Sequence, residues 1–296
     1  SVKSRGLGDV YKRQGFSYEI AGRSERDQPI FAIKAGNGPI KILIWSQMHG
    51  NESTCTKALF DFIFNLENLG ISSVLKHCSF IIIPILNPDG ANNYKRLNAN
   101  GIDLNRDAKS LTQSESLVLR TIFNTFKPEF CFNMHDQRSI YCVAGTKNSA
   151  GLSFLAPSQD KERSISSNRK QAMGIISEIN NVLQLFIPNH ISRFDDSFNI
   201  NCVGDQFQSL GVTTILFEAG HISDYNREDT RKYMFMSLLI AINCISLRIV
   251  PKDAVESYHD IPENKPLLFD VLIKNASVEV DGTCLLYTSD AADDPT

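Results

Sequence analysis

The sequence predicts an α/β fold in which helices cover both faces of a largely parallel or mixed β-sheet. Short strand-like runs alternate along the chain with longer segments whose apolar residues recur at helical spacing, and this alternation is typical of such sheets. Segment 78–86 (CSFIIIPIL) is an almost continuous apolar run, which is characteristic of a strand buried on both faces. With 296 residues, of which 42% are hydrophobic, the chain can hold one large domain or two small ones.

The first half of this fold begins with two strands, at 29–35 and 41–46, which are rich in Ile and separated by the turn residues GNGP. A helix is expected at 54–68, because its apolar residues recur at helical spacing and Ser53 or Thr54 can cap its start. The strand at 78–86 comes next in the chain.

The second half continues the same alternation. A helix at 112–126 ends before Pro128, because proline cannot continue a helix. The elements expected after it are a strand at 129–135, a helix at 168–186, a loop at 193–205, a strand at 212–220 and a long helix at 228–247.

The two ends of the chain differ from its middle. Residues 1–14 and 284–296 show neither helical nor strand periodicity and look non-native, so we expect the main domain to occupy residues 15–250. Residues 251–283 are less regular. We expect them to form either a closing segment of the same domain or the start of a truncated second domain.

Composition argues against several kinds of partner. The net charge is −3 and the Lys and Arg residues are scattered, so nucleic acid is not expected to bind. No apolar run reaches the length of a membrane span. The seven cysteines include no C-x-x-C pair and most lie in apolar runs, which predicts buried free thiols and a cytoplasmic location. The sequence gives no indication of oligomeric state.

Ionisable side chains come at the ends of three expected strands: His49 and Glu52 in HGNE, His135 in MH, and Glu218 in FEAG. A single histidine or one H-x-x-E pair after a strand is more often structural than functional. In sheets of this kind, however, ligands bind beyond the carboxyl ends of the strands. Three strand ends that converge on one edge are therefore much stronger evidence for a site.

The chemistry of this set fits a zinc hydrolase. Two histidines and one carboxylate (His49, His135 and Glu52) can ligate one Zn²⁺ ion and leave a fourth position for water. Bound zinc acidifies that water and polarises a carbonyl group. A second carboxylate that does not bind the metal, Glu218, can then accept the water's proton.

The loop at 85–107 is rich in Asn, Asp, Gly and Arg, a composition that ordinarily indicates a surface loop. It begins with a tight NPDG turn and then carries Arg96, Asn105 and Arg106 toward the same sheet edge. Arginine binds carboxylates in bidentate fashion and can stabilise developing negative charge. A zinc site beside two arginines suits cleavage of a peptide next to its terminal carboxylate.

Five motifs, HGNE, NPDG, RLNANGIDLNR, MH and LFEAG, appear in this order between about Lys41 and Gly220. Together they resemble those of the zinc carboxypeptidases related to carboxypeptidase A. The resemblance implies a three-layer α/β/α sandwich with a mixed, mainly eight-stranded sheet. It also implies a zinc metallopeptidase that removes the C-terminal residue of a peptide.

The resemblance also implies a role for each matched residue. It assigns one zinc ion to His49, Glu52 and His135, and the role of general base to Glu218. Arg96 matches the arginine that stabilises the tetrahedral oxyanion. Asn105 and Arg106 match the pair that grips the substrate's C-terminal carboxylate, and Asp103 matches an acid that orients the first histidine ligand.

The sequence departs from the family pattern at four positions. Digestive members have an aromatic residue after NRN, whereas NRD here gives Asp107, and Asp136 adds an acid beside His135. The tyrosine that usually closes over the substrate has no clear counterpart, although Phe198 lies in that neighbourhood. His221 follows FEAG, and we favour an exposed residue over one that supports the metal.

Two other functions remain open at this stage. One is a zinc amidohydrolase of small N-acyl amino acids, and the other is a binding module that kept the fold without the reaction. The leaving residue is also open. If Asp205 faces the pocket, a basic C-terminal residue is expected; if Gly204 faces it instead, a larger or neutral residue fits. Cell-wall peptides are a third option.

Overall fold

The computed structural model describes residues 16–65, 72–222, 227–249, 251–269 and 271, together with the backbone of 276–280 and 283–287. The expected leader, 1–14, and residues 288–296 of the expected tail lie outside these described residues.

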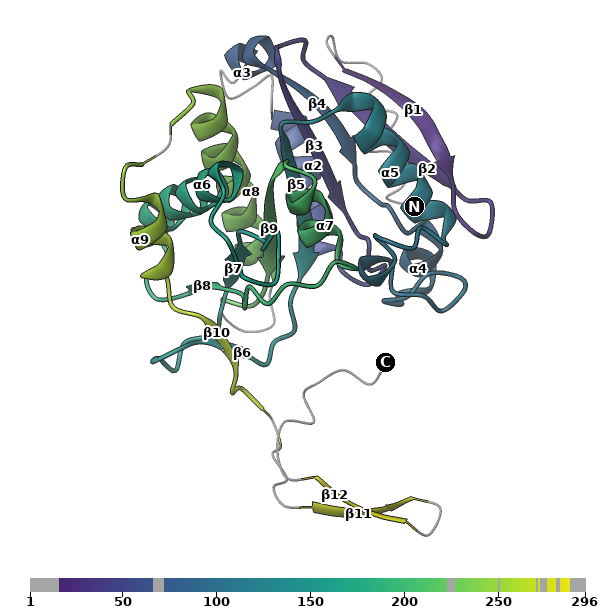
Figure 1. The fold of residues 1–296 in the computed structure, drawn as a ribbon, viewed down its shortest axis with the longest axis vertical. Helices are drawn as coiled ribbons and strands as arrows, with labels where there is room; N and C mark the ends of the chain where they lie inside the picture. The colour runs from purple at the N-terminus through teal and green to yellow at the C-terminus, as the bar shows by residue number, and fades with distance from the viewer. Residues whose placement is uncertain are drawn as a thin grey trace.

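An eight-stranded mixed sheet forms the middle layer, with strand order β1-β2-β4-β3-β5-β9-β7-β8 (Figure 1). Its central strands β4, β3, β5 and β9 are parallel, while β2 runs antiparallel to β4 and β7 antiparallel to β9. The prediction of a mixed, mainly eight-stranded sheet is therefore confirmed. The strands are β1 (Phe16–Arg23), β2 (Pro29–Ala35), β3 (Ile40–Ser46), β4 (Cys78–Ile83), β5 (Phe130–Asp136), β7 (Leu152–Leu155), β8 (Ile191–Arg193) and β9 (Thr213–Ala219).

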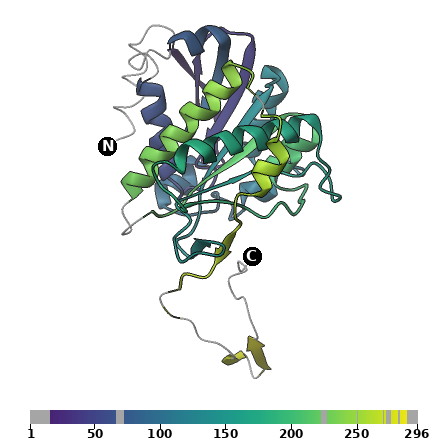
Figure 2. The same cartoon turned by 90° about the vertical axis from the view of Figure 1, so that its left-hand side faces the viewer.

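Helices pack on both faces of this sheet (Figures 1 and 2), which confirms the three-layer sandwich. The larger apolar core joins the sheet to α2, α6, α8 and α9, and the smaller core joins the opposite face to α5 and α7. The helices of the larger core are α2 (Thr54–Asn65), α6 (Ser167–Leu183), α8 (Arg227–Ser246) and α9 (Ala254–His259). Those of the smaller core are α5 (Ser114–Phe126) and α7 (Val203–Ser209).

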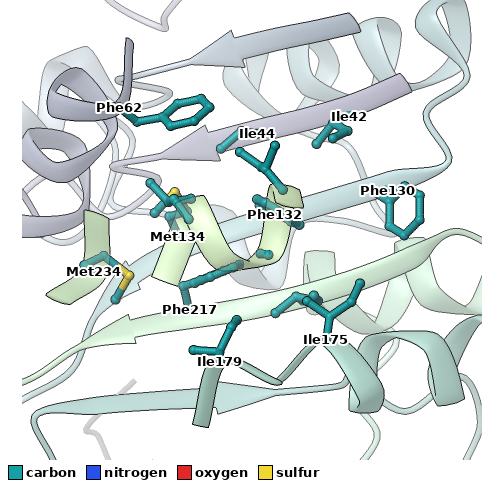
Figure 3. Close-up of a cluster of buried hydrophobic side chains, with 14 of the residues drawn as sticks. Ile42, Ile44, Phe62, Phe130, Phe132, Met134, Ile175, Ile179, Phe217 and Met234 are labelled. Carbon is teal, nitrogen blue, oxygen red and sulfur yellow. The ribbon is translucent and has the colours of Figure 1, made fainter. Parts of the chain in front are cut away.

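Side-chain alternation along the central strands separates the two cores. In β3, Ile42 and Ile44 belong to the larger core, whereas Leu43 and Trp45 belong to the smaller one, as the two-residue period of a strand requires. Figure 3 shows Ile42 and Ile44 in the larger cluster together with Phe132 of β5. The hydrophobic runs of the sequence thus supply both cores at once.

Several short elements were not predicted from the sequence. Strands β1, β7 and β8 extend the two sides of the sheet, and the segment expected as a loop at 193–205 begins in β8 and ends in α7. These short elements depend on pairing with neighbours rather than on their own residue pattern. The remaining ones are α3 (Ser72–His77), α4 (Pro88–Asn93), the 3₁₀ helix η1 (Leu104–Arg106) and strand β6 (Tyr141–Val143).

The C-terminal segment lies partly on the main domain. Tyr258 of α9 is buried in the larger core, and β10 (Asn264–Pro266) pairs with β6. Strands β11 (Ala276–Val280) and β12 (Thr283–Tyr287) form a separate hairpin that crosses the expected boundary at residue 284 (Figure 1).

Two further findings concern the described residues alone. None of the described helices has both the length and the apolar character needed to cross a bilayer. Cys202 is partly exposed, and the other five described cysteines are buried free thiols, Cys55, Cys78, Cys131, Cys142 and Cys244.

Candidate active site

The parallel strands β3, β5 and β9 end side by side. His135 of β5 and Glu218 of β9 are direct partners in the strand register. Their neighbours Met134 and Phe217 point into the larger core, so alternation turns both ionisable side chains toward the opposite face. The sheet therefore presents an imidazole and a carboxylate next to each other at its carboxyl edge.

The HGNE loop follows β3 and carries His49 and Glu52 to the same edge. Gly50 approaches the backbone of the NPDG turn so closely that a Cβ there would lie 2.0 Å from the carbonyl carbon of Gly90. The Asn87 side chain joins the two loops, because it accepts the N–H of Gly90 at 2.8 Å and donates to the carbonyl of Met48 at 3.1 Å. Glycine at position 50 is therefore required by this contact.

His49, Glu52 and His135 converge on one point, and their candidate ligand atoms all lie within 4.8 Å of one another. His49 Nδ1 is 2.8 Å from Glu52 Oε1, and His135 Nδ1 is 2.8 Å from Glu52 Oε2. The two Nδ1 atoms are 3.1 Å apart. All three side chains are buried.

The donor set itself argues for a cation at this point. The other ring nitrogen of His49, Nε2, lies 2.9 Å from the Asp103 carboxylate. If it donates its proton there, the His49 Nδ1 lone pair faces the Glu52 carboxylate and the His135 ring. Two lone pairs and a carboxylate repel one another unless a proton or metal ion lies between them. The residues therefore fit a zinc ion with two imidazole ligands and one carboxylate ligand.

The charges of the triad lead to the same conclusion. Burial disfavours the charged form of His49, but the Glu52 carboxylate and the bond to Asp103 outweigh it and raise the pKa of His49. At His135 burial dominates and lowers the pKa. Burial opposes ionisation of Glu52, yet the two imidazoles hold its pKa below the usual range. The raised pKa of His49 means that a divalent ion competes with protons for this triad.

Arg96 bridges two of the acids around the triad. Its Nη1 donates to Glu52 Oε1 at 3.2 Å and its Nη2 to Asp103 Oδ2 at 3.1 Å. The side chain remains partly exposed and lines the adjacent cavity. Asp103 is thus bonded to both His49 and Arg96, and it fixes the orientation of both groups.

Glu218 lines the same cavity. Burial raises the pKa of Glu218 well above its ordinary value, and the Glu52 and Asp136 carboxylates add to this effect while Arg96 opposes it. A carboxyl group with a raised pKa is suited to accept and return a proton near neutral pH.

Asn105 and Arg106 lie on η1, at the end of the loop 85–107, which we call the arginine loop, and both line the cavity. The Asn105 Oδ1 accepts the N–H of Val203 at 3.0 Å, which ties the loop to the start of α7. Arg106 Nη1 lies 3.2 Å from the sulfur of Cys202 and 3.0 Å from the carbonyl oxygen of Asn105. The guanidinium is therefore positioned by α7 as well as by its own loop.

Comparisons with known proteins relate this chain to zinc carboxypeptidases. Residues 12–146 match the sequence profile described as zinc carboxypeptidase, Peptidase_M14. Over this stretch, which is a little under half of the chain, the protein is similar to zinc carboxypeptidases. The probable carboxypeptidase 2 of Arthroderma benhamiae is 25% identical over 121 residues, which are 38% of this chain and 23% of that protein. Carboxypeptidase 2 of Trichophyton rubrum is 26% identical over 137 residues, 43% of this chain and 25% of that protein.

Solved structures of carboxypeptidases share the fold. A metallo-carboxypeptidase from Burkholderia cenocepacia has a TM-score of 0.65 at 16% identity, covering 83% of this chain and 68% of that one. One from Pseudomonas aeruginosa, in complex with (2-guanidinoethylmercapto)succinic acid, has a TM-score of 0.65 at 12% identity over 82% of this chain and 68% of that one. By contrast, this chain spans only about a quarter of the length of the curated relatives it matches.

A cavity of about 680 Å³ opens beside the triad. Gly204 and Asp205 at the start of α7 both line it, so the two alternatives for the specificity pocket lie in one wall. Burial raises the pKa of Asp205 to about 6, although its carboxylate accepts the N–H of Asn199 at 2.8 Å. The wall that these two residues form therefore contains a carboxylate with little access to water.

The four departures from the family pattern have distinct surroundings. Asp107 is buried and accepts the N–H groups of Thr112 and Gln113, at 2.9 and 3.0 Å, and so fixes the end of the arginine loop. Phe198 is not among the described residues that line the cavity. His221 is partly buried, and its Nε2 lies 3.3 Å from Arg227, which with burial lowers the pKa of His221. His221 is therefore not exposed as expected, because Arg227 at the start of α8 contacts it.

Asp136, the fourth departure, is the last residue of β5 and caps the start of helix α2. Its two carboxylate oxygens accept the N–H groups of Thr54 and Cys55 at 2.8 and 3.0 Å. Its own N–H donates to Glu52 Oε2 at 3.1 Å. The extra acid beside His135 therefore orients the Glu52 carboxylate and stabilises the start of α2.

Sequence reasoning missed Gln137, Tyr141 and Phe194, all of which line the cavity. Gln137 is buried and Tyr141 belongs to β6, a strand of three residues. None of them lies in a recognised motif. The one available signal concerned Gln137, which lies two residues after His135 of the MH motif.

Proposed function

We propose that this chain is a zinc metallocarboxypeptidase that hydrolyses the C-terminal peptide bond of its substrates. The observation that carries the proposal is a single cavity lined by the His49–Glu52–His135 triad, by Glu218, and by Arg106. A carboxylate-binding arginine beside a metal-binding triad favours substrates with a free C-terminus.

In the proposed reaction each residue of the cavity has a separate chemical role. A zinc ion held by the triad would acidify water and polarise the scissile carbonyl. Glu218 accepts the proton of the attacking water and returns it to the leaving amine. Arg96 donates hydrogen bonds to the negative charge that develops on the carbonyl oxygen, and Asp103 keeps Arg96 and His49 in place.

Asn105 and Arg106 bind the terminal carboxylate of the substrate in this proposal. Arg106 contacts Cys202 and Asn105 is bonded to Val203. A substrate carboxylate at Arg106 therefore brings the side chain of the last residue next to the first turn of α7, where Asp205 lines the cavity. A basic side chain would stabilise the Asp205 carboxylate, so we propose that a C-terminal Lys or Arg is preferred.

The free thiols of the described chain favour a reducing compartment, and we propose a cytoplasmic location on that basis.

The test compares kcat/KM for matched peptides with a free and an amidated C-terminus. A charge-assisted hydrogen bond contributes roughly 1.5–3 kcal/mol, so the free acid should be cleaved at least about tenfold more efficiently. Arg106→Ala should remove most of this preference, whereas Arg23→Ala, which removes an exposed arginine of β1, should leave it intact. A panel of peptides with different last residues then tests the preference for Lys and Arg.

Equal rates on acid and amide in the wild type would reject the carboxypeptidase assignment. The same panel should include small N-acyl amino acids, because an amidohydrolase of the same fold would prefer them over peptides. Zinc binding without hydrolysis of any substrate would instead indicate a binding module.

A further inference from the structure

The C-terminal segment 261–268 binds three elements that form one wall of the cavity. It lies well outside residues 12–146, which match the family profile. Ile261 anchors it in the larger core, where that side chain is 1% exposed. From there the segment runs past β8 and pairs with β6 (Figure 1).

The first contact of this segment is with Arg193, at the end of β8. The N–H of Arg193 donates to the carbonyl of Pro262 at 2.8 Å, and its Nε donates to the carbonyl of Ile261 at 3.0 Å. Its guanidinium also pairs with Glu263 at 3.1 Å. Arg193 immediately precedes Phe194, which lines the cavity.

The second contact is with β6. Asn264, Lys265 and Pro266 pair with Val143, Cys142 and Tyr141 in antiparallel register. Two backbone bonds flank this pairing, from Ala144 N–H to the carbonyl of Glu263 at 2.8 Å and from Leu268 N–H to the carbonyl of Ile140 at 2.9 Å. Among the described strands, β10 is the only one in the same sheet as β6. Residues 148–150 also bond to β6, because the carbonyl of Tyr141 accepts the N–H of Ala150 at 3.0 Å. The C-terminal segment therefore shares the positioning of Tyr141 with this neighbouring turn.

The third contact is with Gln137, two residues after His135. Asn264 Nδ2 donates to Gln137 Oε1 at 3.2 Å, and the Asn264 side chain is buried. The Gln137 amide also donates to the carbonyl of Ala150 and accepts from Ser153. Asn264 thus completes the hydrogen bonding of a buried amide in the cavity wall.

The wall held in this way has an aromatic surface. The rings of Tyr141 and Phe194 pack against each other with centroids 5.4 Å apart and an interplanar angle of 59°. Both residues line the cavity together with Glu218 and the metal triad. Paired aromatic rings offer a rigid apolar surface at low cost in side-chain entropy, which is typical of residues that bind ligands.

We propose that Tyr141 is a substrate-binding residue and that segment 261–268 helps to position it, through its pairing with β6 and through the bond of the Asn264 side chain to Gln137 in the same wall. This inference rests on the proposed peptidase function and adds a second surface that contacts the peptide, separate from the arginine loop. The ring of Tyr141 packs against the substrate, so its removal weakens substrate binding and not the chemical step. Asn264 acts through this wall and does not touch the substrate.

The test uses full-length protein and separates KM from kcat. Tyr141→Ala should raise KM at least about tenfold with kcat within about threefold of wild type, whereas Tyr141→Phe should stay within about threefold in both. Asn264→Ala should raise KM about three- to tenfold, in keeping with the loss of one buried hydrogen bond. Zinc content and the melting temperature report whether the triad and the fold remain intact.

Two matched controls remove similar groups elsewhere. Tyr18→Ala removes a partly exposed ring from β1, and Asn65→Ala removes the hydrogen bond from Asn65 Nδ2 to the carbonyl of Asp61 in α2. Both should leave KM unchanged. Comparing each cavity variant with its control separates an effect on the wall from a general loss of stability.

A double-mutant cycle tests the link between the two residues. If Asn264 acts by holding Tyr141, Asn264→Ala should change KM by less than twofold in a protein that already carries Tyr141→Ala. Full additivity would refute the positioning role, and a KM within twofold of wild type for folded, zinc-bound Tyr141→Ala would refute the substrate contact. Either failure leaves the preference for free-acid over amidated peptides untouched, so it is distinguishable from failure of the proposed function.

Discussion

Asp205→Asn should stabilise the protein above pH 6 and have little effect near pH 4. Asp205 is 6% exposed, and burial raises its pKa from the ordinary value of 3.8 to about 6. Between these two values the folded state retains a proton that the unfolded state has released. Stability therefore falls as the pH rises through this window, and the penalty is complete above the folded pKa.

The raised pKa sets the size of the effect. A change from 3.8 to about 6 corresponds to about 3 kcal/mol. Asparagine has nearly the same shape and retains an oxygen that can accept the N–H of Asn199. The variant should therefore gain up to about 3 kcal/mol over wild type at pH 7, and the gain should shrink toward zero near pH 4.

The assay is urea unfolding of both proteins at a series of pH values, with a chelator present so that metal binding does not contribute. Trp45 is the single tryptophan of the chain and is fully buried in the smaller core. Its ring meets Phe207 of α7 edge to face at 5.4 Å, so its fluorescence reports unfolding close to Asp205. The histidines of the triad titrate in both proteins, and their contribution cancels in the difference.

Asp195→Asn provides a control of opposite sign. The hydrogen bond from Ser197 lowers the pKa of Asp195, so the wild-type carboxylate adds stability above its unfolded pKa and loses it as the pH falls. A stability difference between wild type and Asp205→Asn that does not change from pH 4 to pH 7 would refute the reasoning. So would a variant that is less stable than wild type at pH 7.

Two further predictions concern the metal site. Glu218→Gln should retain zinc but lose about 10²–10⁴-fold in kcat, because a general base is removed while the triad is unchanged; metal analysis and kcat check this, and activity within a few-fold of wild type would identify another group as the base. Asp103→Asn should weaken zinc binding about 10–100-fold, because the His49 ring loses its charged partner at 2.9 Å. Competition with a chromophoric chelator measures this affinity, and an unchanged value would contradict the orienting role.

Much of the fold and the triad could be predicted from local sequence patterns. Strands β3, β5 and β9 could be predicted from their apolar runs, because a strand buried on both faces is apolar at nearly every position. The groups that follow these runs, His49, His135 and Glu218, must then meet at one edge, because parallel strands all end there. Strand type and strand direction are enough for this inference, and neither requires knowledge of a distant contact.

The wall of the cavity that Gln137, Tyr141 and Phe194 form could be recognised only in the tertiary structure. Strand β6 has three residues, and the strand that it pairs with, β10, lies more than 120 residues later in the chain. Asn264 and Gln137 are 127 positions apart and meet through one hydrogen bond. A short strand and a single amide contact carry no periodic signal, because their conformation comes from a partner and not from their own residues.

The arginine loop lies between these two cases. Its Asn, Asp, Gly and Arg residues predict a polar loop, and the motif RLNANGIDLNR indicates which of them can bind an anion. Yet the direction of Arg106 depends on Cys202, and that of Asn105 on the N–H of Val203, at the start of a helix in a segment where the sequence predicts a loop. The sequence by itself therefore determined which chemical groups reach the sheet edge. Only the packing of distant segments decided the shape and charge of the cavity around them, because that packing sums many weak long-range contacts that no local pattern records.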